Sequence, residues 1–104
     1  MTPGRILLAV ALAGILSVPA QAATIQITIT KLVFDPVTVE AKVGDTIEWI
    51  NKDVIAHTAT ARNGDWNVMI GPNKTARLVL KKAGSVDYYC RFHPNMKGKL
   101  SIAP

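Results

Sequence analysis

The strongest constraint on the fold of this chain is the alternation of apolar and polar residues in several short stretches. Ile25, Ile27 and Ile29 alternate with polar residues, which is the period of two expected for a β-strand with one buried face. The alternation recurs over residues 39–43, 47–49, 57–61, 76–80, 86–90 and 99–102, with turn residues between the stretches. Little of the sequence after residue 22 has a helical period. The pattern predicts an all-β fold, a Greek-key β-sandwich or small barrel of antiparallel type with about seven to eight short strands.

Residues 62–74 are the least regular segment of this region. Gly and Asn punctuate both ends of the segment, and apolar residues are concentrated in its middle. We expect a loop there, with at most a short strand around residues 66–70.

The first 22 residues are expected to form a secretory signal peptide. Arg5 is the only charge in this stretch, residues 6–18 are an apolar run, and Ala20, Gln21 and Ala22 form the small-x-small pattern of a signal peptidase site. The apolar run is too short to cross a bilayer. We therefore expect a cleaved signal peptide at residues 1–22, one domain at residues 23–104, and a soluble periplasmic protein with no membrane anchor after cleavage.

Cys90 is the only cysteine, so the chain cannot form an internal disulfide. An unpaired thiol is a liability in an oxidising compartment, which leaves three interpretations: an intermolecular disulfide, a buried inert thiol or a thiolate bound to a metal. Domains of this size often depend on a disulfide or a metal for stability. The residues around Cys90 must decide among the three.

Three potential metal ligands, Cys90, His93 and Met96, follow one another at three-residue spacing after a predicted strand. The only other histidine, His57, lies 33 residues upstream of the cysteine. Two His, one Cys and one Met form the ligand set of a blue-copper centre, with trigonal His₂Cys coordination and a long axial Met. Each residue alone has an ordinary explanation, as a leftover thiol, a surface or core histidine, or a packing methionine. Their joint order and spacing predict a site for one copper ion, whereas Met69 has no spacing relation to them and is assigned to packing.

The chemistry of copper explains these residue types. Thiolate sulfur suits Cu(I), imidazole suits both oxidation states, and a weak thioether leaves the site away from the square-planar geometry that Cu(II) prefers. One intermediate geometry then serves both states, so little has to move when an electron arrives. Pro94 stiffens the short loop by fixing its own φ and restricting His93 before it.

The sequence also resembles a known family, the cupredoxins, and within it the short-loop blue-copper proteins of the amicyanin and plastocyanin type. The resemblance covers the whole chain after residue 22 and is carried by residues 43–51, 83–90 and 96–100 and by the Cys-x-x-His-x-x-Met spacing. It implies a cupredoxin-like β-sandwich in which His57, Cys90 and His93 are the equatorial copper ligands and Met96 is the axial ligand.

Two features depart from that family's pattern. Many cupredoxins carry Asn after the first ligand His, where its backbone N–H donates to the copper thiolate and its side chain joins two loops. Here the position is Thr58, so the backbone donor is kept and a hydroxyl must provide the side-chain link. Segment 62–74 looks shorter than in amicyanin, so amicyanin's partner specificity is not carried over.

The resemblance implies a periplasmic type 1 copper protein that shuttles one electron between redox partners and is not an enzyme. The ring edge of His93 would lie at the surface beside Phe92 and Pro94 as the exit route for the electron. The net charge is +5 for the whole chain, and it becomes +4 once Arg5 is removed with the leader. That charge favours a partner protein with an acidic docking surface, and the few aromatic residues argue against a nucleic-acid partner. We expect a monomer.

Two other functions remain open from the sequence. A periplasmic copper-binding or delivery protein without a dedicated redox partner would need the same ligands, and differs in releasing its metal to an acceptor. A catalytic copper or zinc site would need an open coordination position and a nearby acid or base. Asp53 and Asp87 are the only acids near the predicted ligands in sequence, and neither lies in the ligand loop.

Overall fold

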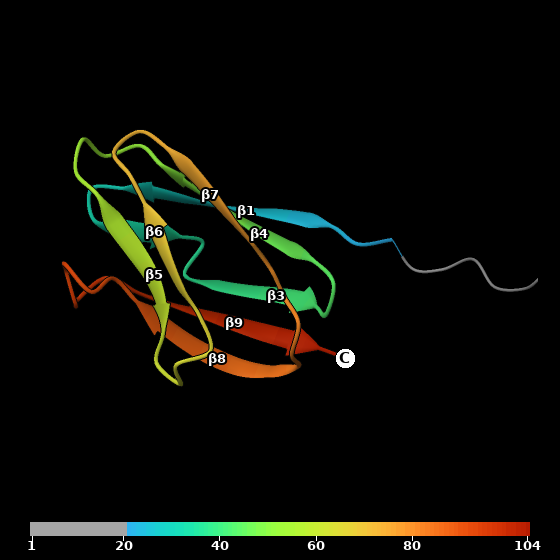
Figure 1. Cartoon of the computed structure of the whole chain (residues 1–104). Helices are drawn as coiled ribbons and strands as arrows, with labels where there is room; N and C mark the ends of the chain where they lie inside the picture. Colours follow the sequence, from blue (N-terminus) through green and yellow to red (C-terminus); the bar gives the residue numbers. More distant parts are fainter. Residues whose placement is uncertain (1–20) are drawn as a thin grey trace, which may run out of the picture.

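The computed structural model describes residues 21–104, in which nine strands form two sheets packed face to face (Figure 1). The strands are β1 (Thr24–Thr30), β2 (Val33–Asp35), β3 (Thr38–Lys42), β4 (Thr46–Asn51), β5 (His57–Ala61), β6 (Asn67–Ile70), β7 (Thr75–Val79), β8 (Gly84–Tyr89) and β9 (Lys97–Ala103). One sheet has the order β2-β1-β4-β7 and the other β3-β9-β8-β5-β6. The all-β sandwich predicted from the sequence is confirmed. Residues 1–20, which hold nearly all of the expected signal peptide, lie outside the described residues.

The prediction of an antiparallel arrangement is wrong for two strand pairs. β1 runs parallel to β4, and β3 runs parallel to β9, while the other pairs are antiparallel. An alternating sequence reports which face of a strand is buried and carries no information on the direction of its neighbour. The sheets are therefore mixed.

Seven of the nine strands coincide with the alternating stretches, and β6 is the short strand expected within residues 62–74. β2 was not predicted, because a strand of three residues with only Phe34 buried is too short to show a period. Val43 was expected to continue the buried stripe of β3, but β3 ends at Lys42 and Val43 is exposed. Gly44 follows with a φ of 98°, which turns the chain into β4.

The core between the sheets is built from the apolar faces of the strands and from an aromatic cluster. Trp49, Tyr88 and Phe34 are fully buried, and Trp66 packs against the first two. The indole N–H of Trp49 donates to the Tyr88 hydroxyl at 3.3 Å. Burial raises the pKa of Tyr88 to about 12, so its hydroxyl stays neutral. The cluster stiffens β8 immediately before Cys90.

The described part of the chain holds no helix long and apolar enough to cross a membrane.

Candidate metal centre

Two of the predicted ligands are brought together by the pairing of β5 with β8. His57 is the first residue of β5, and Cys90 directly follows β8, two strands that pair through Thr60 and Tyr89. Both ligand residues are fully buried. The Sγ atom of Cys90 lies 3.7 Å from Nδ1 of His57. Two residues 33 positions apart are thus held by rigid strands at the same end of the sandwich.

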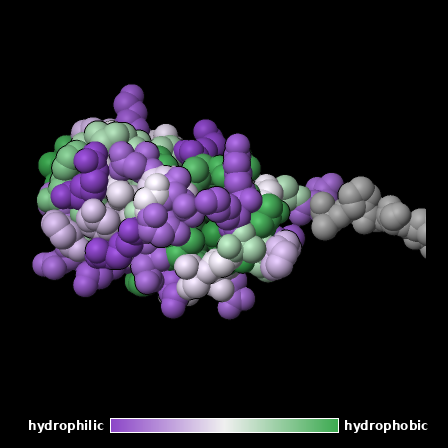
Figure 2. Space-filling model, turned by 60° about the horizontal axis from the view of Figure 1, so that its bottom comes forward, coloured by the Kyte–Doolittle hydropathy of each residue, from purple (hydrophilic) through white to green (hydrophobic). Residues whose placement is uncertain are grey.

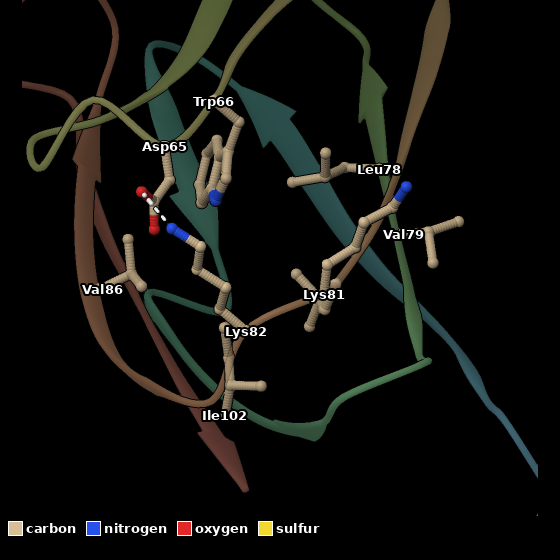
Figure 3. A pocket seen from close by; sticks show the side chains of 9 residues that line it. Asp65, Trp66, Leu78, Val79, Lys81, Lys82, Val86 and Ile102 are labelled. Atoms are coloured by element: carbon tan, nitrogen blue, oxygen red, sulfur yellow. Dashed lines mark hydrogen bonds and ion pairs between the residues drawn. The ribbon is translucent and has the colours of Figure 1, made fainter. Parts of the chain in front are cut away.

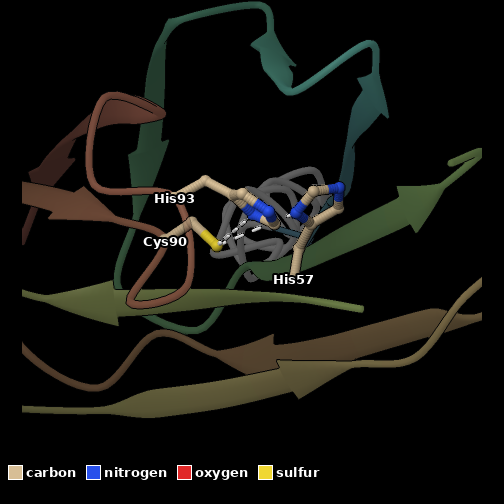
Figure 4. Close-up of side chains that lie close together, drawn as sticks. All are labelled: His57, Cys90 and His93. Atoms are coloured by element: carbon tan, nitrogen blue, oxygen red, sulfur yellow. Dashed lines mark hydrogen bonds between the residues drawn. The ribbon is translucent and has the colours of Figure 1, made fainter. Parts of the chain in front are cut away.

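His93 completes the cluster from the loop between β8 and β9 (Figure 4). Its Nδ1 atom lies 3.6 Å from Sγ of Cys90, and its ring centroid lies 5.0 Å from that of His57. The candidate ligand atoms of the three residues all lie within 4.8 Å of one another. Among residues 21–104 this is the only such cluster of His, Cys, Asp or Glu side chains.

Met96 lies at the end of the same loop, next to β9, and is 3% exposed. Its backbone N–H donates to the carbonyl of His93 at 2.9 Å, and its carbonyl accepts from the N–H of Cys90 at 3.1 Å. The backbone therefore closes the ligand loop between Cys90 and Met96. Met69 lies on edge strand β6 with a largely exposed side chain. The sequence-based assignment of Met69 to core packing is therefore wrong.

Thr58 links the two halves of the centre in the way expected from the sequence. Its backbone N–H donates to Sγ of Cys90 at 3.4 Å. Its hydroxyl oxygen accepts the backbone N–H of Arg91 at 2.8 Å. The hydroxyl thus provides the link between the start of β5 and the ligand loop, and the backbone donor stabilises negative charge on the sulfur.

Asp53 orients the ring of His57, a role that the sequence analysis missed. Its Oδ2 atom lies 2.8 Å from Nε2 of His57. The Asp53 carboxylate also accepts the backbone N–H of Lys31 on Oδ1 at 2.7 Å and that of Leu32 on Oδ2 at 3.0 Å. Both residues have positive φ in the turn between β1 and β2. Burial raises the pKa of Asp53, but the hydrogen bonds from Leu32, Lys31 and His57 outweigh it, so the pKa lies below its ordinary value. The carboxylate fixes the proton on Nε2 and leaves Nδ1 free to face the thiol.

Asn51, the last residue of β4, holds the loop that carries Asp53. Its side-chain amide donates to the carbonyls of Ile55 at 2.9 Å and Gly71 at 3.0 Å, and its Oδ1 accepts the N–H of Asp53 at 2.9 Å. The only sequence signal for either role was the position of both residues just before His57. Outside a helix, a spacing of four residues does not by itself predict that two side chains meet, so that signal was insufficient.

A separate pocket of about 230 Å³ lies away from the cluster, and none of the four predicted ligands lines it. Trp66, Val86 and Ile102 contribute apolar walls, and Lys82 donates to Asp65 at 3.3 Å beside them (Figure 3). Lys82 remains largely exposed in this pair, as expected for a solvated turn.

The donor set of the cluster fits copper. A thiol and two imidazoles are soft and borderline ligands that suit both oxidation states of that metal. The two Nδ1 atoms face the sulfur, and the Nε2 atom of His57 is already bound by a carboxylate, which is the usual arrangement around a metal-ligating histidine.

The comparison with protein families shows which family the chain belongs to. Residues 5–102 match the family described as a cupredoxin-like domain. The chain belongs to the cupredoxin family. The resemblance stated from the sequence is thereby confirmed.

This cupredoxin is similar to several amicyanins and to a related protein. It is 31% identical over 91 residues to amicyanin from Paracoccus versutus, and the aligned region covers 82% of this chain and 67% of the relative. It is 33% identical over 91 residues to the methylamine utilization protein MauL from Methylorubrum extorquens, covering 84% of this chain and 80% of the relative. Among solved structures, the Cu(I) form of a methionine-to-alanine variant of amicyanin superposes with a TM-score of 0.67 at 30% identity, covering 81% of this chain and 85% of that one.

Proposed function

We propose that this cupredoxin is a periplasmic type 1 (blue) copper protein that carries one electron at a time between redox partners, and is not an enzyme. His57, Cys90 and His93 would hold one copper ion, with Met96 as a fourth, weaker ligand. The observation that carries the proposal is the buried convergence of one thiol and two imidazole nitrogens, with Sγ–Nδ1 distances of 3.7 and 3.6 Å.

Copper, when bound, supplies a one-electron couple between Cu(I) and Cu(II). The residues of the chain hold the ligands in place for both states. Asp53 fixes the ring of His57, and the N–H of Thr58 stabilises the charge on Cys90. Because these contacts exist within the fold itself, little rearrangement accompanies the exchange of an electron.

The burial of the site favours an electron carrier over a copper-delivery protein. His57 and Cys90 are fully buried, so an acceptor protein cannot reach them without opening the fold. Four ligands from the chain would also leave no coordination position for a substrate, which argues against catalysis.

His93 is the proposed point of electron exchange, because it is the one equatorial ligand that is not fully buried. A surface depression beside it is lined by Leu32, Pro94, Asn95 and Met96. Leu32 and Pro94 are exposed apolar residues in this lining, and such residues suit a transient contact with a partner protein.

The docking partner is proposed to carry an acidic surface. The Arg91 guanidinium lies 5.9 Å from the ring centroid of exposed Phe92, close to His93 in the chain, and Lys97 is exposed just beyond the loop. Figure 2 shows hydrophilic residues over much of the visible face, with smaller apolar areas between them. Cations beside the exit route would steer an acidic partner toward it.

We also propose that residues 1–22 are a signal peptide cleaved on export, that the mature protein is residues 23–104, and that it acts as a monomer. The leader-like sequence before Ala23 supports the cleavage and the export.

The copper-loaded protein tests the proposal against its alternative. We expect Cu(I) protein to be oxidised by ferricyanide, an anionic oxidant, in a reaction that slows as ionic strength rises and leaves the copper bound. A cationic oxidant should show the opposite salt dependence. Loss of copper to a strong Cu(I) chelator at a rate above that of electron exchange would instead favour delivery.

A further inference from the structure

Ala23 is the first of the described residues that hydrogen-bonds to the sandwich. Its backbone N–H donates to Oδ1 of Asp45 at 2.9 Å, and its carbonyl accepts the N–H of Thr46 at 2.8 Å. Among residues 21–104, no hydrogen bond involves Gln21 or Ala22, and both are exposed. The ordered contacts therefore begin at the residue that follows the expected cleavage position.

Asp45 is a buried carboxylate whose hydrogen-bond donors are backbone amides. It is 3% exposed, and its Oδ2 atom accepts the backbone N–H of Lys42 at 2.9 Å. The hydrogen bond from Ala23 is the main cause that holds the pKa of Asp45 below its ordinary value, followed by the bond from Lys42. Within residues 21–104, Asp45 takes part in no salt bridge. Buried carboxylates are stabilised most when paired with a hydrogen-bonded cation.

We propose that removal of the leader creates this cation: the new α-ammonium group of Ala23 binds the Asp45 carboxylate and locks the start of β1 onto the sandwich. Hydrolysis of the Ala22–Ala23 peptide bond consumes one water and gives a carboxylate on Ala22 and an ammonium on Ala23. The nitrogen that already lies 2.9 Å from Oδ1 thereby acquires a positive charge. The inference rests on the proposed processing and not on the copper chemistry.

The position of the cut decides whether the ion pair forms. Cleavage one residue earlier would leave the charge on exposed Ala22, about 3.8 Å farther along the chain. Cleavage one residue later would remove Ala23 together with its bond to Thr46. Of these three cuts, only the one after Ala22 places the ammonium on the buried carboxylate.

The ion pair and the candidate metal centre lie at opposite ends of the sandwich. β1 and β4 run in parallel from Ala23 and Asp45 to the turns that carry Lys31 and Asp53, and the six residue steps of β1 alone span about 20 Å. A variant at the Ala23 end is therefore expected to change stability and to leave the visible spectrum of the copper site unchanged.

The test compares two copper-loaded proteins as they are exported and processed. One is the natural chain, and the other has a single glycine inserted between Ala22 and Ala23. The insertion keeps the N–H donor of Ala23 but moves the terminal charge one residue away. We expect the insertion to lower the melting temperature by about 5 °C, a shift of the size that one lost interaction causes in a domain of this length. Intact mass identifies the first residue of each protein.

Repeating the insertion in two substituted proteins shows which carboxylate pairs with the terminal ammonium group. In Asp45→Asn the insertion should no longer change the melting temperature, whereas in Asp65→Asn, a matched control at a distant exposed turn, the full decrease should remain. An equal decrease in folded Asp45→Asn, a change below about 1 °C in the natural background, or a natural N-terminus other than Ala23 would overturn the inference.

If Asp45→Asn does not fold, the reactivity of the terminal amine tests whether the ion pair forms. We expect the amine of the natural protein to react with pyridoxal phosphate about tenfold more slowly than that of the insertion variant. Equal rates would overturn the inference. Absence of a blue spectrum from all variants would contradict the proposed function and leave this result intact.

Discussion

At the scale of single residues, the orientation of His57 depends on one carboxylate. Asp53 accepts from Nε2 at 2.8 Å, and that contact decides which ring nitrogen faces Cys90. We predict that Asp53→Ala weakens copper binding by about 10- to 100-fold, the usual effect of losing the partner of a ligand histidine. Competition with a chelator of known affinity measures this. Asp65→Ala, which removes an exposed carboxylate far from the site, should leave the affinity unchanged, and equal losses in both variants would contradict the role of Asp53.

Met96 offers a prediction on the reduction potential. Met96→Leu should keep copper bound but raise the potential, because a weak donor that favours Cu(II) is replaced by none. A shift of about 60 mV corresponds to a tenfold change in the preference for Cu(I). Voltammetry measures it, with Met69→Leu as the control because Met69 is exposed on β6. If the two substitutions exchanged effects, the axial ligand would be wrongly assigned.

At the scale of strands and loops, the sequence predicted what depends on local patterns. The strand that begins at His57 and the strand that ends just before Cys90 follow from alternation, and the ligand loop follows from its spacing. Strand direction, the three-residue β2 and the contact of Asp53 with the turn at Lys31 depend on pairing between distant segments. Such contacts are set by the assembled fold and leave no periodic signal in one sequence.

The packing of β9 against β8 depends on Gly98. A Cβ atom at this position would overlap the ring of Tyr88, which lies in the rigid core. We predict that Gly98→Ala lowers the free energy of unfolding by about 2 kcal/mol, within the usual range for overpacking. Urea denaturation measures it. Gly71→Ala is the matched control, since its Cβ would meet only the flexible side chain of Lys74 at 3.2 Å, and a similar loss there would refute the steric explanation.

At the scale of the whole molecule, acid should destabilise the fold. The hydrogen bond from Gln26 holds the pKa of Glu48 below its ordinary value of 4.5, with help from Arg77. A carboxyl whose pKa is lower in the folded state adds stability above its unfolded pKa, and that stability is lost as pH falls through the folded pKa.

We therefore predict that the unfolding free energy of the copper-free protein falls as pH drops below about 4.5. Glu48→Gln should be less stable than the natural protein at pH 7 and should approach it at low pH. Urea denaturation across this range measures the difference. A constant difference between the two proteins at all pH values would show that Glu48 does not contribute through its charge.

The central claim, a copper thiolate at Cys90, is tested most directly by adding one equivalent of Cu(II) to the purified protein and recording the visible spectrum. We predict an intense thiolate-to-copper charge-transfer band, and its complete loss in Cys90→Ser with the β-sheet circular dichroism retained. No such band in the natural protein, or a blue band that persists in Cys90→Ser, would contradict the account.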